Sequence, residues 1–225
     1  MGQSETSLGG LLALCLAAAI PIAAAQAESA VPFELSQKFV TEHKVKSLVG
    51  PSVQVDEQGQ VSLAWMEEEK DVRSVLYARS AEAGGPMGAP VRINRPEDVP
   101  YWRQEAPALV VQGEDVFVTW GLAHPKATPQ QPFATELRLS RSIDGGKTFQ
   151  PSVAVNDDPG VIQHTFDALH RDADGRLHLS WIDGREGKKE PGTYVARSLD
   201  RGATITRNLK VDEGTCVCCR TAVTS

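Results

Sequence analysis

The sequence predicts an all-β chain built from repeated four-stranded antiparallel units. Three tryptophans, Trp65, Trp120 and Trp181, lie 55 and 61 positions apart. Each ends a short segment in which apolar residues occupy every second position, the period of a strand with one buried face. The same order of short strands and tight turns recurs around each tryptophan. The chain therefore reads as three copies of one unit.

Each unit begins with a hairpin. The first strands are expected at residues 51–55, 107–111 and 166–169. Gly and Asp in the segments that follow favour tight turns, which are expected at residues 56–59, 112–115 and 172–175. The tryptophan strands then cover residues 61–65, 116–120 and 177–181.

Two more strands complete each unit. The third strand ends in Arg-Ser in every copy, at residues 76–80, 137–142 and 194–198. The fourth strands are expected at residues 90–94, 152–156 and 208–212. A small sheet cannot bury both of its faces alone, so repeated sheets of this kind predict a β-propeller. A β-sandwich of short strands is the alternative.

The predicted blades cover residues of about 50–94, 105–157 and 164–214, and a fourth blade starts at 215–225. A closed propeller typically has about 4–8 blades. Since about three and a half blades are present, we expect the sequence to be a fragment or a truncated product of a longer propeller.

Two of the units carry a more specific motif after the Arg-Ser strand. Residues 142–149 read SIDGGKTF and residues 198–205 read SLDRGATI. Both resemble the Asp-box, S-x-D-x-G-x-T-[WF], of the sialidase-like (bacterial neuraminidase repeat) propeller superfamily. Ser and Asp side chains suit a turn because they accept hydrogen bonds from its exposed N–H groups, and Gly tolerates positive φ. The structural Asp-box residues are Ser142, Asp144, Gly146, Thr148, Phe149, Ser198, Asp200 and Gly202.

This resemblance implies a six-bladed propeller, and it implies several possible activities. Known members include exo-α-sialidases, other glycosidases and proteins with no assigned reaction. Sialidases bind the substrate carboxylate with three arginines, use an Asp as acid/base and use a Tyr paired with a Glu as nucleophile. Fold alone does not choose among these functions.

Residues 1–27 are predicted to be a signal peptide. Residues 11–20 form an apolar core, and Ala25-Gln26-Ala27 precedes Glu28 as a cleavage site. The mature chain is then secreted or periplasmic, with residues 28–49 as a lead-in. The apolar stretch is shorter than the ~20 residues that span a bilayer, so no stable membrane span is expected. A net charge of −6 with mixed signs argues against nucleic-acid binding.

The predicted strand order places the loops after the second and fourth strands at one mouth, opposite the Asp-boxes. Long polar loops often carry function. The expected mouth segments are residues 67–73, 101–105, 121–131, 157–164, 183–186 and 216–220.

Within these loops we expect a site for a glycan or a small anionic ligand. Arginine suits the binding of a carboxylate because its planar fork makes two parallel hydrogen bonds. The candidate ligand-binding residues are Arg103, Arg185, Arg220, Tyr101, Trp102 and Glu105. The resemblance to sialidases makes Asp183 the candidate acid/base. The alternative is a solvated rim of ordinary ion pairs. The family's usual Phe/Tyr-Arg-Ile-Pro start is absent, which argues against catalysis by this chain as given. An exo-α-sialidase-type glycoside hydrolase, in a full-length form, is the alternative function.

Three cysteines of the predicted mature chain lie within four positions: Cys216, Cys218 and Cys219. An odd number in an exported protein suggests a disulfide to a partner elsewhere, a reactive thiol or a metal site. Cys216 and Cys218 alternate onto one strand face, where two thiolates could bind a soft metal together with His164 or His124. A structural or metal-binding propeller is therefore a third functional hypothesis. No cofactor is expected, and the sequence does not indicate an oligomeric state.

Overall fold

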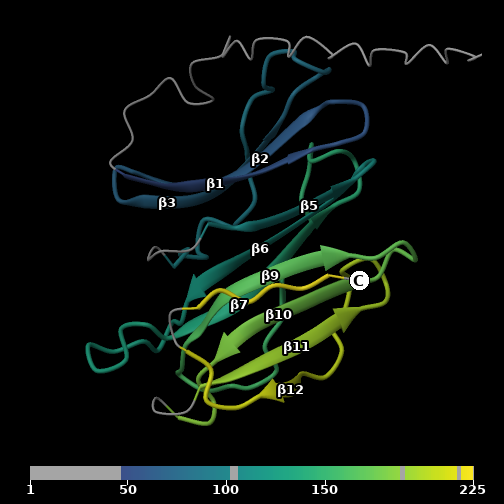
Figure 1. Ribbon diagram of the computed structural model, residues 1–225. Helices are drawn as coiled ribbons and strands as arrows, with labels where there is room; N and C mark the ends of the chain where they lie inside the picture. The colour runs from purple at the N-terminus through teal and green to yellow at the C-terminus, as the bar shows by residue number, and fades with distance from the viewer. Residues whose placement is uncertain (1–46, 102–105, 188–190, 217–218, 225) are drawn as a thin grey trace, which may run out of the picture. The chain divides into compact units, whose positions relative to one another are not determined.

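The computed structural model describes residues 47–224, except 102–105, 188–190 and 217–218. The described residues form twelve strands in three four-stranded antiparallel sheets, without helices (Figure 1). Accordingly, no helix among them could cross a membrane. The predicted signal peptide lies outside the described residues. The prediction of an all-β chain with repeated four-stranded sheets is confirmed.

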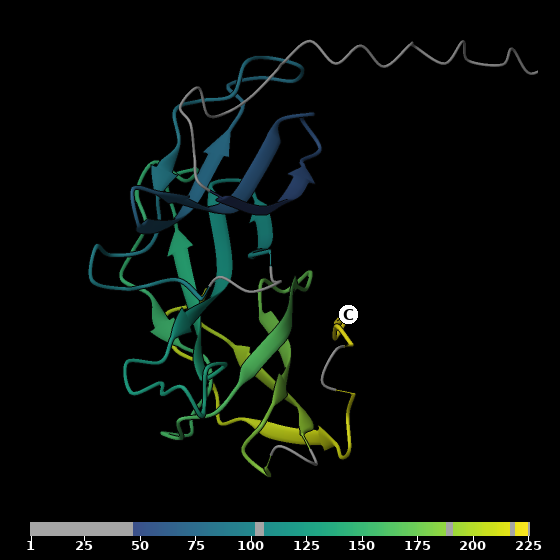
Figure 2. The ribbon, with the colours of Figure 1, turned by 90° about the vertical axis from the view of Figure 1, so that its left-hand side faces the viewer.

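The strands of every sheet pair in chain order, as the progression of colour across each sheet shows (Figures 1 and 2). The first sheet contains β1 (Ser47–Val55), β2 (Val61–Glu69), β3 (Val72–Arg79) and β4 (Val91–Arg92). The second contains β5 (Ala108–Gln112), β6 (Asp115–Ala123), β7 (Thr135–Ser142) and β8 (Val153–Ala154). The third contains β9 (His164–Arg171), β10 (Leu177–Asp183), β11 (Gly192–Ser198) and β12 (Leu209–Asp212).

One predicted loop is a hairpin instead. Residues 67–73 were expected to form a long polar loop, but β2 continues to Glu69 and β3 begins at Val72. Lys70 and Asp71 form the two-residue turn, with φ angles of 48° and 65°. Two successive residues with positive φ are typical of the turn that matches the twist of paired strands. The polar residues on either side of this turn therefore belong to β2 and β3, and they do not form a long loop.

The three repeat tryptophans are buried, which confirms that they pack in the core. One apolar cluster joins the first and second sheets, with Met66 and Tyr77 on one side and Val118 and Trp120 on the other. A second cluster joins the second and third sheets through Phe117, Leu139, Trp181 and Tyr194. Both faces of the second sheet, and one face each of the first and third sheets, are therefore covered by a neighbouring sheet, which is how repeated small sheets bury apolar surface.

The two predicted Asp-box turns have the same hydrogen bonds. The N–H of Gly146 donates to Oγ of Ser142 at 2.9 Å, and that of Gly202 donates to Oγ of Ser198 at 2.7 Å. The hydroxyl of Thr148 donates to Asp144 at 2.6 Å, as does that of Thr204 to Asp200. Both glycines have positive φ, of 85° and 78°.

Polar contacts also join neighbouring sheets, and they differ between the two junctions. Between the first and second sheets, the Gln54 amide exchanges hydrogen bonds with the backbone of Val111, and Arg79 donates to the carbonyl of Gly113. Between the second and third sheets, Asp115 forms ion pairs with Arg171 and Arg201. We call these junctions the first seam and the second seam.

Candidate functional site

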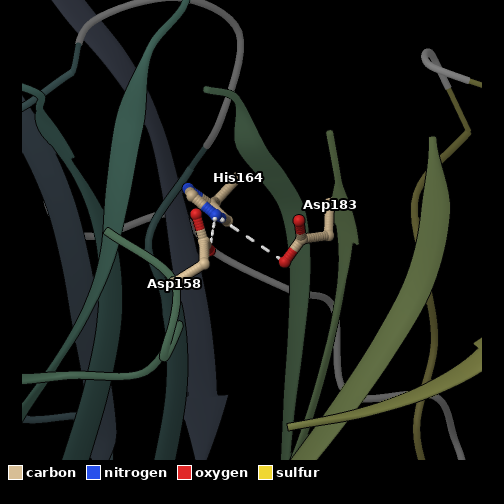
Figure 3. A group of neighbouring side chains, drawn as sticks. All are labelled: Asp158, His164 and Asp183. Carbon is tan, nitrogen blue, oxygen red and sulfur yellow. Dashed lines mark hydrogen bonds and ion pairs between the residues drawn. The ribbon is translucent and has the colours of Figure 1, made fainter. Parts of the chain in front are cut away.

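A group of charged side chains lies at one edge of the third sheet. Asp183 ends β10 and pairs in register with His164, the first residue of β9. Asp158 belongs to the connection between β8 and β9. Figure 3 shows these three side chains converging, with His164 between the two carboxylates. Strand pairing fixes two of them, and the preceding loop supplies the third.

His164 is buried and makes a hydrogen bond with each ring nitrogen. Nε2 lies 2.7 Å from Oδ2 of Asp158, and Nδ1 lies 2.5 Å from the carbonyl oxygen of Thr135. Both partners are acceptors, so the ring satisfies both only when each nitrogen carries a proton. A second carboxylate oxygen, Oδ2 of Asp183, lies 3.6 Å from Nε2. The geometry is that of an imidazolium whose Nε2 faces two carboxylates.

Asp183 has no exposed surface. Its Oδ2 accepts hydrogen bonds from the indole of Trp181 at 2.9 Å and from the guanidinium of Arg185 at 2.8 Å. Its Oδ1 accepts the backbone N–H of Arg185 at 2.9 Å. A general acid must reach the atom that it protonates. The structure places this predicted acid/base inside the fold with its oxygens occupied, which does not suit that role.

Arg185 binds side chains from three segments: the connection between β8 and β9, the end of β10 and the approach to β12. Its guanidinium donates to Asp157 at 2.8 Å and to the side-chain oxygen of Asn208 at 2.9 Å, besides Asp183. It also lies 4.2 Å above the ring of Tyr194. Arg185 therefore neutralises the protein's own carboxylates, and its fork does not stand open for a ligand carboxylate.

The pKa values follow from these contacts. Burial opposes the charged form of His164, but the hydrogen bond that it donates to Asp158 and the charge of Asp183 raise its pKa above the ordinary 6.5. Burial likewise acts to raise the pKa of Asp158, and the hydrogen bond and charge of His164 outweigh it, so that the pKa falls to about 2. The contact between His164 and Asp158 therefore favours the charged form of both residues.

The same three residues bring possible metal ligands within 4.8 Å of one another. A metal would have to replace the Nε2 proton of His164, which already lies between the two carboxylates. It would also meet the Arg185 guanidinium, 2.8 Å from Asp183 and 3.3 Å from Asp158. A fixed cation in this position opposes a second one. The donor set fits an ion-pair network, and it does not fit a metal centre.

A polar cavity of about 620 Å³ opens beside the cluster. Its walls carry both signs of charge, an amide and a phenol. The charged groups are Asp157, Asp158, Arg185, Glu186, Arg207 and Lys210. Asn208 and Tyr194 complete the polar lining, and the Tyr194 hydroxyl donates to Glu186 at 2.7 Å. Burial and that hydrogen bond raise the pKa of Tyr194 to about 12, so it remains a donor.

Of the other predicted ligand-binding residues, the structure describes Tyr101 and Arg220, and neither lines the polar cavity with Arg185. Tyr101 is buried, with its Cβ packed toward Gly121 on β6, so it does not line an open mouth. Arg220 is exposed, and its charge acts on the buried Asp167 of β9. Trp102, Arg103 and Glu105 lie outside the described residues. The expected convergence of three arginines includes Arg103, so it stays a prediction.

Of the predicted cysteine site, the structure describes Cys216 and Cys219, and neither is in the group around His164. Cys216 and Cys219 are exposed, and Cys218 lies outside the described residues. In the described part of the chain, the potential ligand cluster of His164 contains only aspartates. His124, the other proposed ligand, accepts the N–H of Lys126 on Nδ1 at 3.1 Å.

Sequence reasoning missed several residues of the site. Asn208, Tyr194 and Lys210 come from strands β11 and β12 or the approach to them, and no spacing links them to residues 157–164. For Asp183, the sequence does contain a signal of burial. Trp-x-Asp at Trp181 and Trp-x-Glu at Trp65 share a position in the repeat, which marks the residue two places after the tryptophan as a buried hydrogen-bond partner.

No protein-family model matches the chain, and no curated protein matches it in sequence. Solved structures do match. An α-L-arabinanase of Penicillium chrysogenum, complexed with arabinobiose, aligns with a TM-score of 0.50 at 12% identity, over 72% of this chain and 49% of that one. An endo-arabinase of Bacteroides thetaiotaomicron aligns with a TM-score of 0.45 at 16% identity, over 68% and 57%. The NanB sialidase of Streptococcus pneumoniae aligns with a TM-score of 0.44 at 10% identity, over 70% and 22%.

These structural neighbours are glycoside hydrolases with a propeller fold. The fold comparison rests on the arabinanase, and at 12% identity it concerns the fold alone. The chain spans about half the length of that enzyme.

Proposed function

We propose that this chain is part of an exported, sialidase-like propeller that binds a glycan in the polar cavity beside Arg185. The cavity itself is the observation that carries the proposal. Carboxylates accept hydrogen bonds, guanidinium and ammonium groups donate them, and the Asn208 amide offers both. A sugar presents hydroxyl groups that donate and accept in the same way, so the lining is complementary to it. The propeller fold of glycoside hydrolases agrees with such a ligand.

The two turns at Ser142 and Ser198 support the sialidase-like part of the proposal, because sequence and hydrogen bonds repeat together. Export is supported by the apolar segment and cleavage site before Glu28. Expression with the native leader, followed by N-terminal sequencing of the exported protein, tests it: Glu28 is the expected first residue.

The balance of charge in the cavity favours a neutral glycan over a sialylated one. Asp157, Asp158 and Glu186 face Arg185, Arg207 and Lys210, so positive charge is not in excess. Calorimetric titration with arabinobiose, lactose and sialyllactose compares the classes directly. Lactose and sialyllactose are a matched pair, since they differ by the sialic acid. Tighter binding of sialyllactose would support the anion-binding alternative.

Lys210→Ala and Arg207→Ala test the location. Each removes an exposed donor from the lining, and a hydrogen bond from a charged group is worth about 1.5–3 kcal/mol, so affinity should fall about tenfold or more. Arg176→Ala is the matched control, because Arg176 is half-exposed and pairs with Asp174 in the β9–β10 turn. Unchanged affinity in both cavity variants would refute this location.

The proposal is one of binding without hydrolysis. The burial of Asp183 supports this part of the proposal, because a general acid must reach the atom that it protonates. We expect no release of fluorophore from 4-methylumbelliferyl sialoside or arabinoside at acidic or neutral pH. Release that is abolished by Asp183→Asn in a folded variant would restore the hydrolase alternative.

A further inference from the structure

Two histidines lie opposite one another on neighbouring strands of the third sheet. His170 of β9 and His178 of β10 are direct partners in the antiparallel register. Side chains paired in this way have their Cβ atoms about 4.5–5.5 Å apart. The two imidazole rings accordingly lie near each other, with centroids 6.4 Å apart and planes inclined at 41°. Strand pairing, and not a loop, therefore keeps the two imidazoles together.

Both rings lie on the face of the third sheet that turns away from the second sheet. Successive side chains of a strand point to opposite faces. Leu177 and Leu179, on either side of His178, belong to the apolar cluster between the second and third sheets. Leu169, next to His170, packs against the same cluster. Both histidines are half-buried, so a small ion can reach the rings from solvent.

Asp172 orients one of these rings. Nε2 of His178 lies 2.8 Å from Oδ2 of Asp172. That hydrogen bond is the main cause of the lowered pKa of Asp172, which is therefore a carboxylate near neutral pH. A carboxylate only accepts, so Nε2 carries the proton and the neutral ring has its lone pair on Nδ1. Nδ1 of His178 has no hydrogen-bond partner among the residues that the structure describes.

The turn between β9 and β10 fixes this carboxylate. Oδ1 of Asp172 accepts the backbone N–H of Arg176 at 2.9 Å, and the backbone N–H of Asp172 donates to the carbonyl of Arg176 at 3.0 Å. A histidine that ligates a metal almost always donates its other ring N–H to a carboxylate, a backbone carbonyl or water. His178 and Asp172 have this arrangement.

We propose that His170 and His178 bind a divalent transition-metal ion, with Asp172 positioning the ring of His178. Neutral imidazole is a good ligand for Zn²⁺, Cu²⁺ and Ni²⁺. A zinc ion lies about 2.0–2.1 Å from each ligating nitrogen, so the rings turn toward each other while the strands stay in place. Water completes the coordination. The pair differs from His164, whose ring nitrogens both face acceptors already.

The cations nearest to the pair do not prevent binding. Nη1 of Arg176 lies 3.8 Å from Oδ2 of Asp172, but this side chain is 50% exposed and its Nη2 lies 2.8 Å from Asp174. Arg197 pairs in register with His178, and it is exposed. Exposed arginine side chains are long enough to keep their charge in water. Both guanidinium groups can therefore stay away from a bound ion.

Calorimetric titration of the untagged full chain tests the proposal. Its thiols are first alkylated with N-ethylmaleimide, because cysteine thiolates also bind these metals. One equivalent of Ni²⁺ should bind, Cu²⁺ should bind more tightly, and Mg²⁺ should not compete, since it prefers oxygen ligands. Ligating imidazoles must be neutral, so Ni²⁺ affinity should fall at least about tenfold from about pH 7.5 to about pH 5.5. Metal binding that disappears on alkylation would overturn the proposal.

His170→Gln and His178→Gln locate the site. Changes in the surroundings of a ligand already cost about 10–100-fold in metal affinity, so removal of one of two ligands should weaken Ni²⁺ binding at least about tenfold. His124→Gln is the matched control, because His124 lies in the connection after β6 and its Nδ1 accepts the N–H of Lys126. Unchanged affinity in either strand variant, or an equal loss in the control, would refute the site. Urea unfolding without metal checks that each variant is folded.

Asp172→Asn tests the positioning role. The new side chain can still accept the N–H of Arg176, but it lacks the charge that strengthens His178 as a ligand. Ni²⁺ affinity should fall about 10–100-fold. Because Asp172 acts through His178, the same substitution should have no further effect in the His178→Gln variant. An equal further loss there would show that Asp172 does not act by positioning this ring.

This proposal is independent of glycan binding in the polar cavity. Lys210→Ala should weaken glycan binding and leave the Ni²⁺ titration unchanged, and His170→Gln should do the reverse. The two sites can therefore fail separately in the same set of proteins.

Discussion

The indole N–H of Trp181 donates to the carboxylate of Asp183, two residues further along β10, at 2.9 Å. Trp65 makes the same contact with Glu67 in the first sheet at 3.3 Å. In the second sheet Leu122 occupies the corresponding position, and Trp120 donates to the hydroxyl of Ser140 instead. The repeat thus keeps the buried tryptophan and varies its polar partner, and in the third sheet that partner also accepts a hydrogen bond from Arg185.

Replacing Asp183 should destabilise the fold strongly. Asp183→Ala leaves Arg185 and Trp181 without their acceptor in a buried place, and breaking a buried ion pair costs about 3–5 kcal/mol. The free energy of unfolding in urea measures the loss. Asp174→Ala is the control, since Asp174 is exposed and its pair with Arg176 should be worth at most about 1 kcal/mol. Similar losses in both variants would contradict the network.

Arg185→Lys should behave as a disruptive substitution. A lysine ammonium cannot reach Asp157, Asp183 and Asn208 with the planar geometry that the guanidinium uses. We expect the free energy of unfolding to fall by about 1–3 kcal/mol, the cost of leaving buried polar groups unsatisfied. A double-mutant cycle with Asp157→Ala isolates the contact across the second seam. Zero coupling energy would show that this ion pair does not contribute.

Stability should decline on both sides of a pH window. The pKa of Asp158 falls from 3.8 to about 2 in the fold, so its contribution is complete above about pH 4 and is lost as the pH falls toward 2. The pKa of His164 is raised above 6.5, so its contribution is complete below that value and is lost as the pH rises through the folded pKa. Denaturant midpoints measured across pH should show both losses of stability, one at low pH and one above pH 6.5.

Histidine variants identify the group that causes the loss of stability above pH 6.5. Asp158 and Asp183 face His164, and Arg185 pairs with both of these carboxylates. His164→Gln should therefore flatten the decline above pH 6.5. His178→Gln is the control, because His178 pairs with Asp172 outside the cluster. If the loss of stability above pH 6.5 is unchanged in His164→Gln, another group causes it.

The turn glycines should differ in their tolerance of a side chain. A Cβ at Gly146 would lie 2.0 Å from the ring of Tyr77, in a residue with a φ of 85°. A Cβ at Gly113 would meet nothing within 4 Å, although its φ is 62°. Gly113→Ala should cost only the backbone strain of about 1–3 kcal/mol, and Gly146→Ala should cost clearly more, because a buried ring must also move. Thermal unfolding of the two variants compares them directly.

The sequence was sufficient for the sheets and insufficient for the site. The alternating residues before Trp65, Trp120 and Trp181 predict strands because the burial period is local. The hairpin turn at Lys70 and Asp71 was missed, since the polar residues around it carry no burial pattern. The cluster depends on which loop residues meet across two sheets, and periodicity says nothing about that.

The two seams should respond differently to the solution around the protein. The second seam is joined by charged pairs, from Arg185 with Asp157 to Arg201 with Asp115. The first is joined by an amide, Gln54, that exchanges hydrogen bonds with Val111. Ion pairs weaken with acid and, where exposed, with salt, and an amide bonded to backbone does neither. Acid and salt should therefore weaken the contacts of the second seam and leave the Gln54 contact of the first seam unchanged.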